Sequence, residues 1–217
     1  MTTPRKSKTR KAEILREYGP HAGKPVVHGV TFDGQRVWFA GGESLVALDP
    51  ASGAVVRELA VAGDAGTAFD GTHLHQIAGG RIHKIDPATG AVVGSIPAPG
   101  QGRDSGLAWA EGSLWVGQYR DRVIHQIHPD TGEILRTVRS DRFVTGVTWV
   151  GGELWHGTWE GEESEIRRVD PVNGAVLERL EMPPDTGVSG LESDGADLFY
   201  CGGGPSGKVR AVRKPQA

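Results

Sequence analysis

Apolar and polar residues alternate in short runs along most of the chain, and turn residues separate these runs. In one stretch the runs cover residues 105–109, 113–117, 122–127 and 133–138. Alternation over about four to eight residues is typical of β-strands, and the Gly, Pro, Asp and Thr residues between the runs are typical of turns. This stretch therefore predicts one four-stranded antiparallel sheet.

The same pattern recurs in five copies. Each copy opens with a glycine at the start of its first strand, and successive glycines lie 37 to 44 residues apart. The openings are Gly29-Val30-Thr31-Phe32, Gly66-Thr67-Ala68-Phe69, Gly106-Leu107-Ala108-Trp109, Gly146-Val147-Thr148-Trp149 and Gly190-Leu191-Glu192-Ser193. Repeats of about 40 residues built from short strands are typical of propeller blades. We therefore expect an all-β fold, a five-bladed β-propeller.

Equivalent positions in the copies keep their chemical character. The second strand carries an aliphatic residue followed in most copies by an aromatic one, as in Leu114-Trp115 and Leu154-Trp155, which indicates the core between blades. The recurring turn Asp-Pro-x-Thr-Gly, as in residues 86–90, has Pro and Gly where a type I turn needs them. Its recurrence favours a structural turn over a calcium or catalytic motif.

The fifth copy stops after its third strand, and the N-terminus offers a replacement. Residues 12–18 match the fourth-strand segment 132–138 of the third copy. We expect residues 12–18 to complete the last blade and close the ring, which removes an unpaired sheet edge. A helix over residues 10–18 is the competing interpretation, because this segment has high helix propensity. Residues 1–11 are expected to be a basic, mobile tail, and residues 12–217 a single propeller domain.

The composition narrows the classes of partner. Gly makes up 33 of 217 residues and falls at fixed places in the repeat, which indicates turns and not disorder. A net charge of −3 argues against nucleic acid or an anionic membrane as the main partner. One cysteine, Cys201, permits no intramolecular disulfide, and residues 1–11 lack an apolar run. We expect a cytoplasmic protein.

The candidate site lies on the side of the disc that carries the longer loops, since function concentrates in such loops. His28, directly before the first inner glycine, is the candidate proton-handling group, with Asp104 or Glu160 as its orienting carboxylate. The candidate substrate-binding residues are Arg103, Tyr119, Arg120, His156 and Trp159. Structural roles compete with these: His156 occupies a packing slot, Trp159 could pack in its loop, and Glu160 begins an acidic, solvated loop.

No established catalytic or cofactor motif is present in the sequence. No cofactor is indicated. A divalent metal held across the channel by His28 and His156 stays open, because spacing alone does not constrain it. The expected partner is a small-molecule or N-terminal peptide ligand.

The unit Ser105-Gly106-Leu107-Ala108-Trp109, with Leu114-Trp115-Val116, Ile127 and Thr131-Gly132-Glu133, resembles the glutamine cyclotransferase propellers. It is also similar to the streptogramin lyase-like propellers. The first resemblance implies five blades and conversion of N-terminal Gln to pyroglutamate at the channel mouth. It also implies an acidic residue directly before an inner glycine, where this chain has His28, Ala65, Ser105, Thr145 and Ser189.

Two functions follow as hypotheses. The first is a cyclotransferase-like or lyase-like enzyme with a small-molecule site at the long-loop mouth of the channel, although the expected acidic residue is absent. The second is a non-catalytic scaffold that binds a peptide or protein on the same face. A narrow pocket that reaches His28 would favour the first, and a flat, open rim would favour the second.

Overall fold

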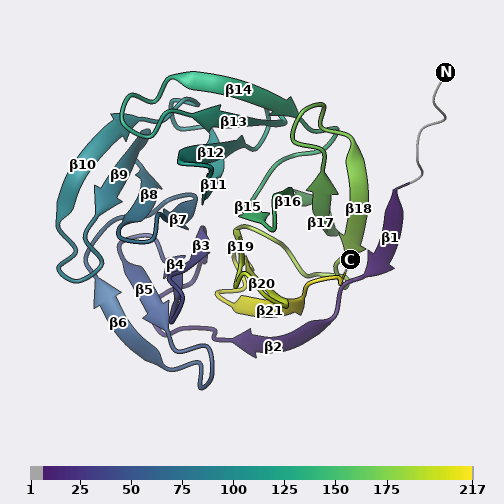
Figure 1. Cartoon of the computed structure of the whole chain (residues 1–217). Helices are drawn as coiled ribbons and strands as arrows, with labels where there is room; N and C mark the ends of the chain where they lie inside the picture. Colours follow the sequence, from purple (N-terminus) through teal and green to yellow (C-terminus); the bar gives the residue numbers. More distant parts are fainter. Residues whose placement is uncertain (1–6, 217) are drawn as a thin grey trace.

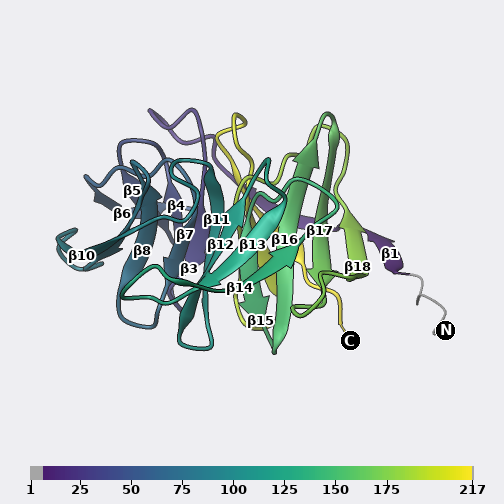
Figure 2. The same ribbon diagram turned by 90° about the horizontal axis from the view of Figure 1, so that it is seen from above.

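The computed structural model describes residues 7–216, which form 21 β-strands in five sheets around a central axis (Figure 1). This is the five-bladed β-propeller that the repeat predicts. Seen from its edge in Figure 2, the strands run between two faces of the disc, and the loops emerge on these faces. Residues 7–216 contain no helix with the length and hydrophobicity that crossing a bilayer requires.

Each blade takes three or four consecutive strands, from the axis outward. Blade one has β3 (Val30–Phe32), β4 (Val37–Ala40), β5 (Leu45–Leu48) and β6 (Val55–Leu59). Blade two has β7 (Thr67–Phe69), β8 (Leu74–Ala78), β9 (Arg81–Ile85) and β10 (Val92–Pro97). Blade three has β11 (Asp104–Ala110), β12 (Ser113–Gln118), β13 (Val123–Ile127) and β14 (Ile134–Arg139). Blade four has β15 (Val147–Val150), β16 (Glu153–Glu160), β17 (Glu163–Val169) and β18 (Val176–Glu181), and blade five has β19 (Leu191–Ser193), β20 (Leu198–Gly202) and β21 (Val209–Arg213).

The hydrophobic core is divided among the gaps between neighbouring blades. One cluster, for example, joins Trp115 and Ile124 of blade three to Val147 and Leu154 of blade four. Equivalent clusters occupy the other four gaps. Both faces of every blade are therefore apolar, which explains why large residues occur at both parities of the strands.

The inner strands of neighbouring blades approach each other so closely that only glycine fits at the start of each strand. A Cβ added to Gly29 would lie 2.5 Å from the carbonyl oxygen of Ala65 in the next blade. One added to Gly190 would lie 2.7 Å from the carbonyl oxygen of His28, across the closure of the ring. The glycine of each repeat thus fixes the distance between two blades.

The Asp-Pro-x-Thr-Gly turns are structural, as their recurrence predicts. In the first of them the Asp49 carboxylate accepts hydrogen bonds from the Ala51 N–H and the Ser52 hydroxyl, both at 2.8 Å. Gly53 has a φ of 78°, the left-handed conformation that glycine adopts without strain. The carboxylate is used within its own turn.

The N-terminal segment closes the ring. β2 (Ile14–Tyr18) pairs antiparallel with β21 and forms the outer strand of blade five. Glu17 accepts a 2.7 Å hydrogen bond from Nε of Arg210, which is only 4% exposed. The predicted closure over residues 12–18 is confirmed, and the competing helix is wrong because strand pairing outweighs the helix propensity of this short segment.

The predicted tail needs a correction. Residues 8–11 form β1 (Lys8–Lys11), which pairs in parallel with β18 and adds a fifth strand to blade four. Figure 1 shows β1 at the outer rim beside β18. Residues 1–6 of the expected tail lie outside the described residues. The sequence does not predict β1 because its pairing is not repeated in any other blade.

Replacing Gly106 with Ala is expected to lower the free energy of unfolding by about 3 kcal/mol, the upper end of the range for overpacking. The new Cβ would lie 2.5 Å from the Thr145 carbonyl oxygen, and backbone atoms cannot turn aside. Urea unfolding measures the change. Gly94→Ala is the matched control: its Cβ meets only the Lys84 Cβ at 3.7 Å, and a loss under about 1 kcal/mol is expected. Equal losses would contradict the close approach of the blades.

Deleting residues 1–18 is expected to lower the midpoint of thermal unfolding by about 10 °C or more. The deletion leaves the buried Arg210 without its carboxylate partner, a loss on the order of 3–5 kcal/mol, and each kcal/mol shifts the midpoint by about 2–4 °C at this size. Calorimetry measures the shift. An unchanged midpoint would show that β2 does not close the ring.

Candidate functional site

The residues that precede the inner glycines meet at one end of the central channel. They are His28, Ala65, Ser105, Thr145 and Ser189, one from each blade, and all five line a cavity of about 240 Å³. The inner strands all run in the same direction, so equivalent positions converge at one mouth. The same cavity is lined by Asp64, Asp104, Tyr119 and Trp159.

The two serine hydroxyls of the mouth join neighbouring blades. The Ser105 hydroxyl donates to the Val144 carbonyl oxygen at 2.7 Å, and the Ser189 hydroxyl donates to that of Val27 at 2.6 Å. Ser189 also accepts a hydrogen bond from the Gly204 N–H at 3.0 Å. These bonds hold the floor of the cavity in place.

Two carboxylates enter the cavity from adjacent blades. Asp64 and Asp104 each stand two residues before an inner glycine, where the other three blades have valine. Sequence reasoning identified Asp104 and missed Asp64. The sequence does contain a signal for Asp64. At the position two residues before the inner glycine, the other blades except blade three have Val27, Val144 and Val188, and all three valines are fully buried.

His28 is half-buried in the cavity, and its environment favours the neutral imidazole. Desolvation by burial lowers the pKa of His28, while the negative charge of Asp64 partly raises it. The neutral ring can accept a proton at physiological pH. Asp64, and not the predicted Asp104 or Glu160, is the carboxylate whose charge acts on His28.

Asp104 is only 8% exposed. Burial raises its pKa, although the Gly100 N–H, which donates to both carboxylate oxygens at 2.9 and 3.1 Å, opposes part of that shift. Its proton is therefore held more tightly than that of an ordinary aspartate. A carboxyl of this kind can donate a proton as well as accept one.

Tyr119 and Trp159 form an aromatic wall. The Tyr119 hydroxyl donates to the Trp159 carbonyl oxygen at 3.0 Å, and the Tyr119 ring packs on Phe143 with ring centroids 4.6 Å apart. The Trp159 indole covers Gly187 and Gly204, where an added Cβ would lie 2.5 and 2.8 Å from the indole ring. These two glycines give the indole its place beside the cavity.

The structure places four predicted site residues away from the cavity. Glu160 accepts a 2.6 Å hydrogen bond from the Phe143 N–H and pairs with Arg142 at 3.4 Å. Arg103 turns outward to Asp121 at 3.1 Å, with 65% of its side chain exposed. Arg120 is exposed at the surface. These three lie on loops or at strand ends, where the repeat fixes the backbone position but not the direction of the side chain.

The fourth, His156, is fully buried inside blade four. Its Nδ1 hydrogen-bonds the Gly157 carbonyl oxygen at 3.0 Å, and desolvation by burial lowers its pKa to about 4. It packs, as its slot in the repeat suggested, and does not line the cavity that holds His28. Within residues 7–216, no group of three or more His, Cys, Asp or Glu side chains could hold a metal ion.

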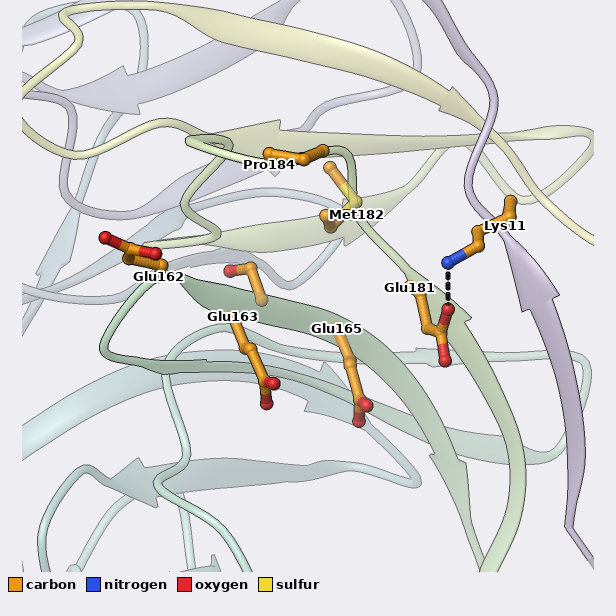
Figure 3. Close-up of a pocket in the computed structure, with 8 residues that line it drawn as sticks. Lys11, Glu162, Glu163, Glu165, Glu181, Met182 and Pro184 are labelled. Carbon is orange, nitrogen blue, oxygen red and sulfur yellow. Dashed lines mark hydrogen bonds and ion pairs between the residues drawn. The ribbon is translucent and has the colours of Figure 1, made fainter.

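A second hollow, of about 400 Å³, lies at the loop end of blade four (Figure 3). It is lined by Glu162, Glu163, Glu165 and Glu181. Arg142 pairs with Glu163 at 3.0 Å, and Arg167 pairs with Glu165 at 2.6 Å. The acidic loop predicted from the sequence is therefore partly neutralised, and it lies apart from the mouth.

Sequence reasoning also left Glu192 without a role. Its carboxylate lies at the centre of the ring, where it accepts hydrogen bonds from Thr31 of blade one at 2.9 Å and from Thr148 of blade four. The Ser193 N–H donates to it at 2.9 Å. Desolvation by burial raises the pKa of Glu192 to about 7. The signal in the sequence is that Glu192 is acidic, whereas the equivalent residues of the other four blades are Thr or Ala.

Comparisons with known proteins agree with the architecture. The PQQ_2 family model, described as outer membrane protein assembly factor BamB, matches residues 78–216. No curated protein matches the chain. Its structure is similar to that of the glutaminyl cyclase of Myxococcus xanthus, with a TM-score of 0.77 and 19% identity over 96% of this chain and 98% of the cyclase.

Two other solved structures share the fold at lower similarity. The virginiamycin B lyase of Staphylococcus aureus is 14% identical, with a TM-score of 0.50 over 92% of this chain and 70% of the lyase. A chain of the mitotic checkpoint complex is 13% identical, with a TM-score of 0.57 over 100% of this chain and 97% of that chain. The resemblance to cyclase and lyase propellers, predicted from the sequence, is confirmed at the level of the fold.

The ionisation of Glu192 should make stability depend on pH. Its pKa in the folded state, about 7, exceeds the value of 4.5 for a free side chain, so its contribution is complete below pH 4.5 and is lost as the pH rises through 7. The expected loss is up to about 3 kcal/mol. Glu192→Gln should remove this part of the pH dependence. Urea unfolding of both proteins between pH 5 and pH 8 measures it, and identical slopes would refute the assignment.

Proposed function

The chain belongs to the PQQ_2 family, described as outer membrane protein assembly factor BamB, and we propose that this member is an enzyme that transfers protons on a small molecule bound at the channel mouth. The observation that carries the proposal is that His28 and Asp104 line the same cavity. Burial lowers the pKa of the first and raises that of the second, so each group can exchange a proton with a bound ligand. Such a pair suits general acid–base chemistry.

The cavity also supports the class of ligand. Its volume of about 240 Å³ is below the roughly 300–1,000 Å³ of pockets for drug-sized ligands, which suits a molecule of amino-acid size or the end of a peptide. Asp64 supplies a negative charge, and Trp159 and Tyr119 supply aromatic faces. An ammonium group is attracted by both. The proposed ligand is therefore a small amine or a peptide N-terminus.

A cyclotransferase-like reaction matches these groups. The amine nitrogen of an N-terminal glutaminyl residue would attack its own side-chain carboxamide carbon, forming the ring C–N bond as the bond to the departing ammonia breaks. His28 would take the proton from the attacking nitrogen, and the Asp104 carboxyl group would pass one to the ammonia. A lyase-like elimination needs the same two roles. The charge of Asp64 would stabilise the imidazolium that forms on His28.

The shape of the mouth bears on the alternative function. A non-catalytic scaffold for a peptide or protein would be favoured by a flat rim. The mouth has a cavity that is broadly open to solvent, and its lining includes His28 and the four equivalent residues of the other blades. A small ligand can therefore reach His28.

Replacing His28 with Ala is expected to lower turnover of a glutaminyl dipeptide at least 100-fold, since general acid–base groups contribute about 10²–10⁴-fold. Asp104→Asn should have a similar effect because the amide cannot exchange the proton. Mass spectrometry of the cyclised product measures turnover. The midpoint of thermal unfolding should change little for His28→Ala.

His83→Ala is the matched control, because His83 lies on β9, away from the cavity, and it should retain full turnover. Full activity of His28→Ala would remove His28 from the site. Binding of the dipeptide by the unmodified protein without any product would instead favour the scaffold.

A further inference from the structure

The outer strands of the blades carry a charge reversal at one position. The third residue of the outer strand is arginine in blades one, three and five: Arg57, Arg136 and Arg16. In blade two it is Gly94, and in blade four it is Glu178. Glu178 is thus the one acid in this column, and it lies on the strand that β1 covers.

Arginine at this position can bind the hairpin of the following blade. Arg16 of blade five donates at 2.9 Å to the carbonyl oxygen of Pro50, in the Asp-Pro turn of blade one. Arg57 of blade one donates in the same way to the Ala88 carbonyl oxygen, in the turn of blade two. Blade four precedes blade five, whose third and fourth strands come from opposite ends of the chain. No Asp-Pro turn joins those strands, so an arginine at position 178 would have no such carbonyl group to bind.

Glu178 receives its cations from two elements. Its side chain is only 6% exposed, and its oxygens lie 3.0 Å from Nε of Arg10 on β1 and 3.5 Å from Nη2 of Arg168 on β17. A buried carboxylate is costly unless it is paired. Docking of β1 therefore adds a second cation to a carboxylate that Arg168 already faces.

The other contacts of β1 are exposed or not specific to sequence. Its backbone pairs with β18 from Lys8 opposite Glu178 to Lys11 opposite Glu181, and the Ala12 N–H donates to the Glu181 carbonyl oxygen at 2.8 Å. The Lys11 ammonium pairs with Glu181 (Figure 3), but 85% of the Lys11 side chain is exposed. Backbone pairing could form on any sheet edge. The ion pair of Arg10 with the buried Glu178 carboxylate is the contact of β1 that depends on its side chains.

We propose that Glu178 holds the N-terminal strand on the edge of blade four through its ion pair with Arg10. Only Ala12 and Glu13 separate β1 from β2, so this edge lies beside the strand, and an arginine at position 178, as at the equivalent position of three other blades, would repel the basic side chains of β1. The occupant of the edge is the chain's own segment 8–11. The N-terminal segment thereby pairs with blade five through β2 and with blade four through β1.

The docked strand also supports the channel mouth. Ala12 binds the end of β18 at Glu181, and the next residue, Met182, donates from its N–H to the Ser164 carbonyl oxygen at 2.9 Å. The Ser164 hydroxyl accepts from the Val188 N–H at 3.1 Å. Residues 182–188 are thus held at both ends, and they include Gly187, on which the Trp159 indole rests. Undocking of β1 should loosen this segment.

The test compares Arg10→Glu with Lys11→Glu in the full-length protein, by hydrogen exchange and mass spectrometry. The two changes reverse equal charges on the same strand, but only Arg10 faces a buried carboxylate. Arg10→Glu should raise the exchange rate of amides in residues 8–12 at least 10-fold, and Lys11→Glu less than about 3-fold. Amides in residues 182–188 should exchange faster in Arg10→Glu only.

Charge reversal on both sides completes the test. Glu178→Arg should expose residues 8–12 as Arg10→Glu does, and the double variant should restore protection to within about 3-fold of the original. Should Glu178→Arg fail to fold, the comparison of Arg10→Glu with Lys11→Glu still decides. Equal exchange in those two variants would overturn the role of Glu178 in holding β1. Unchanged exchange in residues 182–188 after β1 is released would overturn its support of the mouth.

Discussion

The close approach of the five inner strands is the constraint on which the rest of this structure depends. Each strand begins at a glycine whose missing side chain lets the backbone of the next blade come into contact, and the last of these contacts joins Gly190 to the backbone of His28. Because the strands meet there, the residues just before the glycines converge on one small mouth. The same glycines therefore determine both the radius of the ring and the composition of its cavity.

Closing a ring from a linear chain leaves one blade with a break, and the structure joins two distant segments of the chain there. β2 completes blade five beside β21, so the break falls between the third and fourth strands. Blade five therefore lacks the Asp-Pro hairpin that Arg16 and Arg57 bind in blades one and two. The acid at position 178 and the additional strand β1 occur on the blade that precedes this gap. The irregular features of the outer rim thus follow from where the ring is closed.

Much of the fold could be predicted from the sequence, because the repeat compares five copies of one unit. Position along a strand, burial and turn type recur, so the repeat alone predicts Trp115 in the core and residues 12–18 as a strand. Features that occur once have no such comparison. β1 has no counterpart in another blade, and the loop residue Arg103 binds a partner that its sequence neighbours do not reveal. Asp64 is a different case, because it breaks a column of valines and is therefore detectable once that column is compared across the blades.

Some residues differ in type from the equivalent residues of the other blades. Where such a residue lies indicates whether it packs in the core or can act at the candidate site. A position that is part of the core in the other blades is also part of the core when it is a histidine. His156 is an example, since it is buried and its pKa is lowered to about 4. Equivalent positions at the mouth differ in residue type among the five blades, and several of them line the cavity. His28, Asp64 and Asp104 are departures of this kind, and they occur in adjacent blades. A propeller can therefore acquire a site by changing one or two columns of residues at its mouth, while the glycines below keep the blades in place.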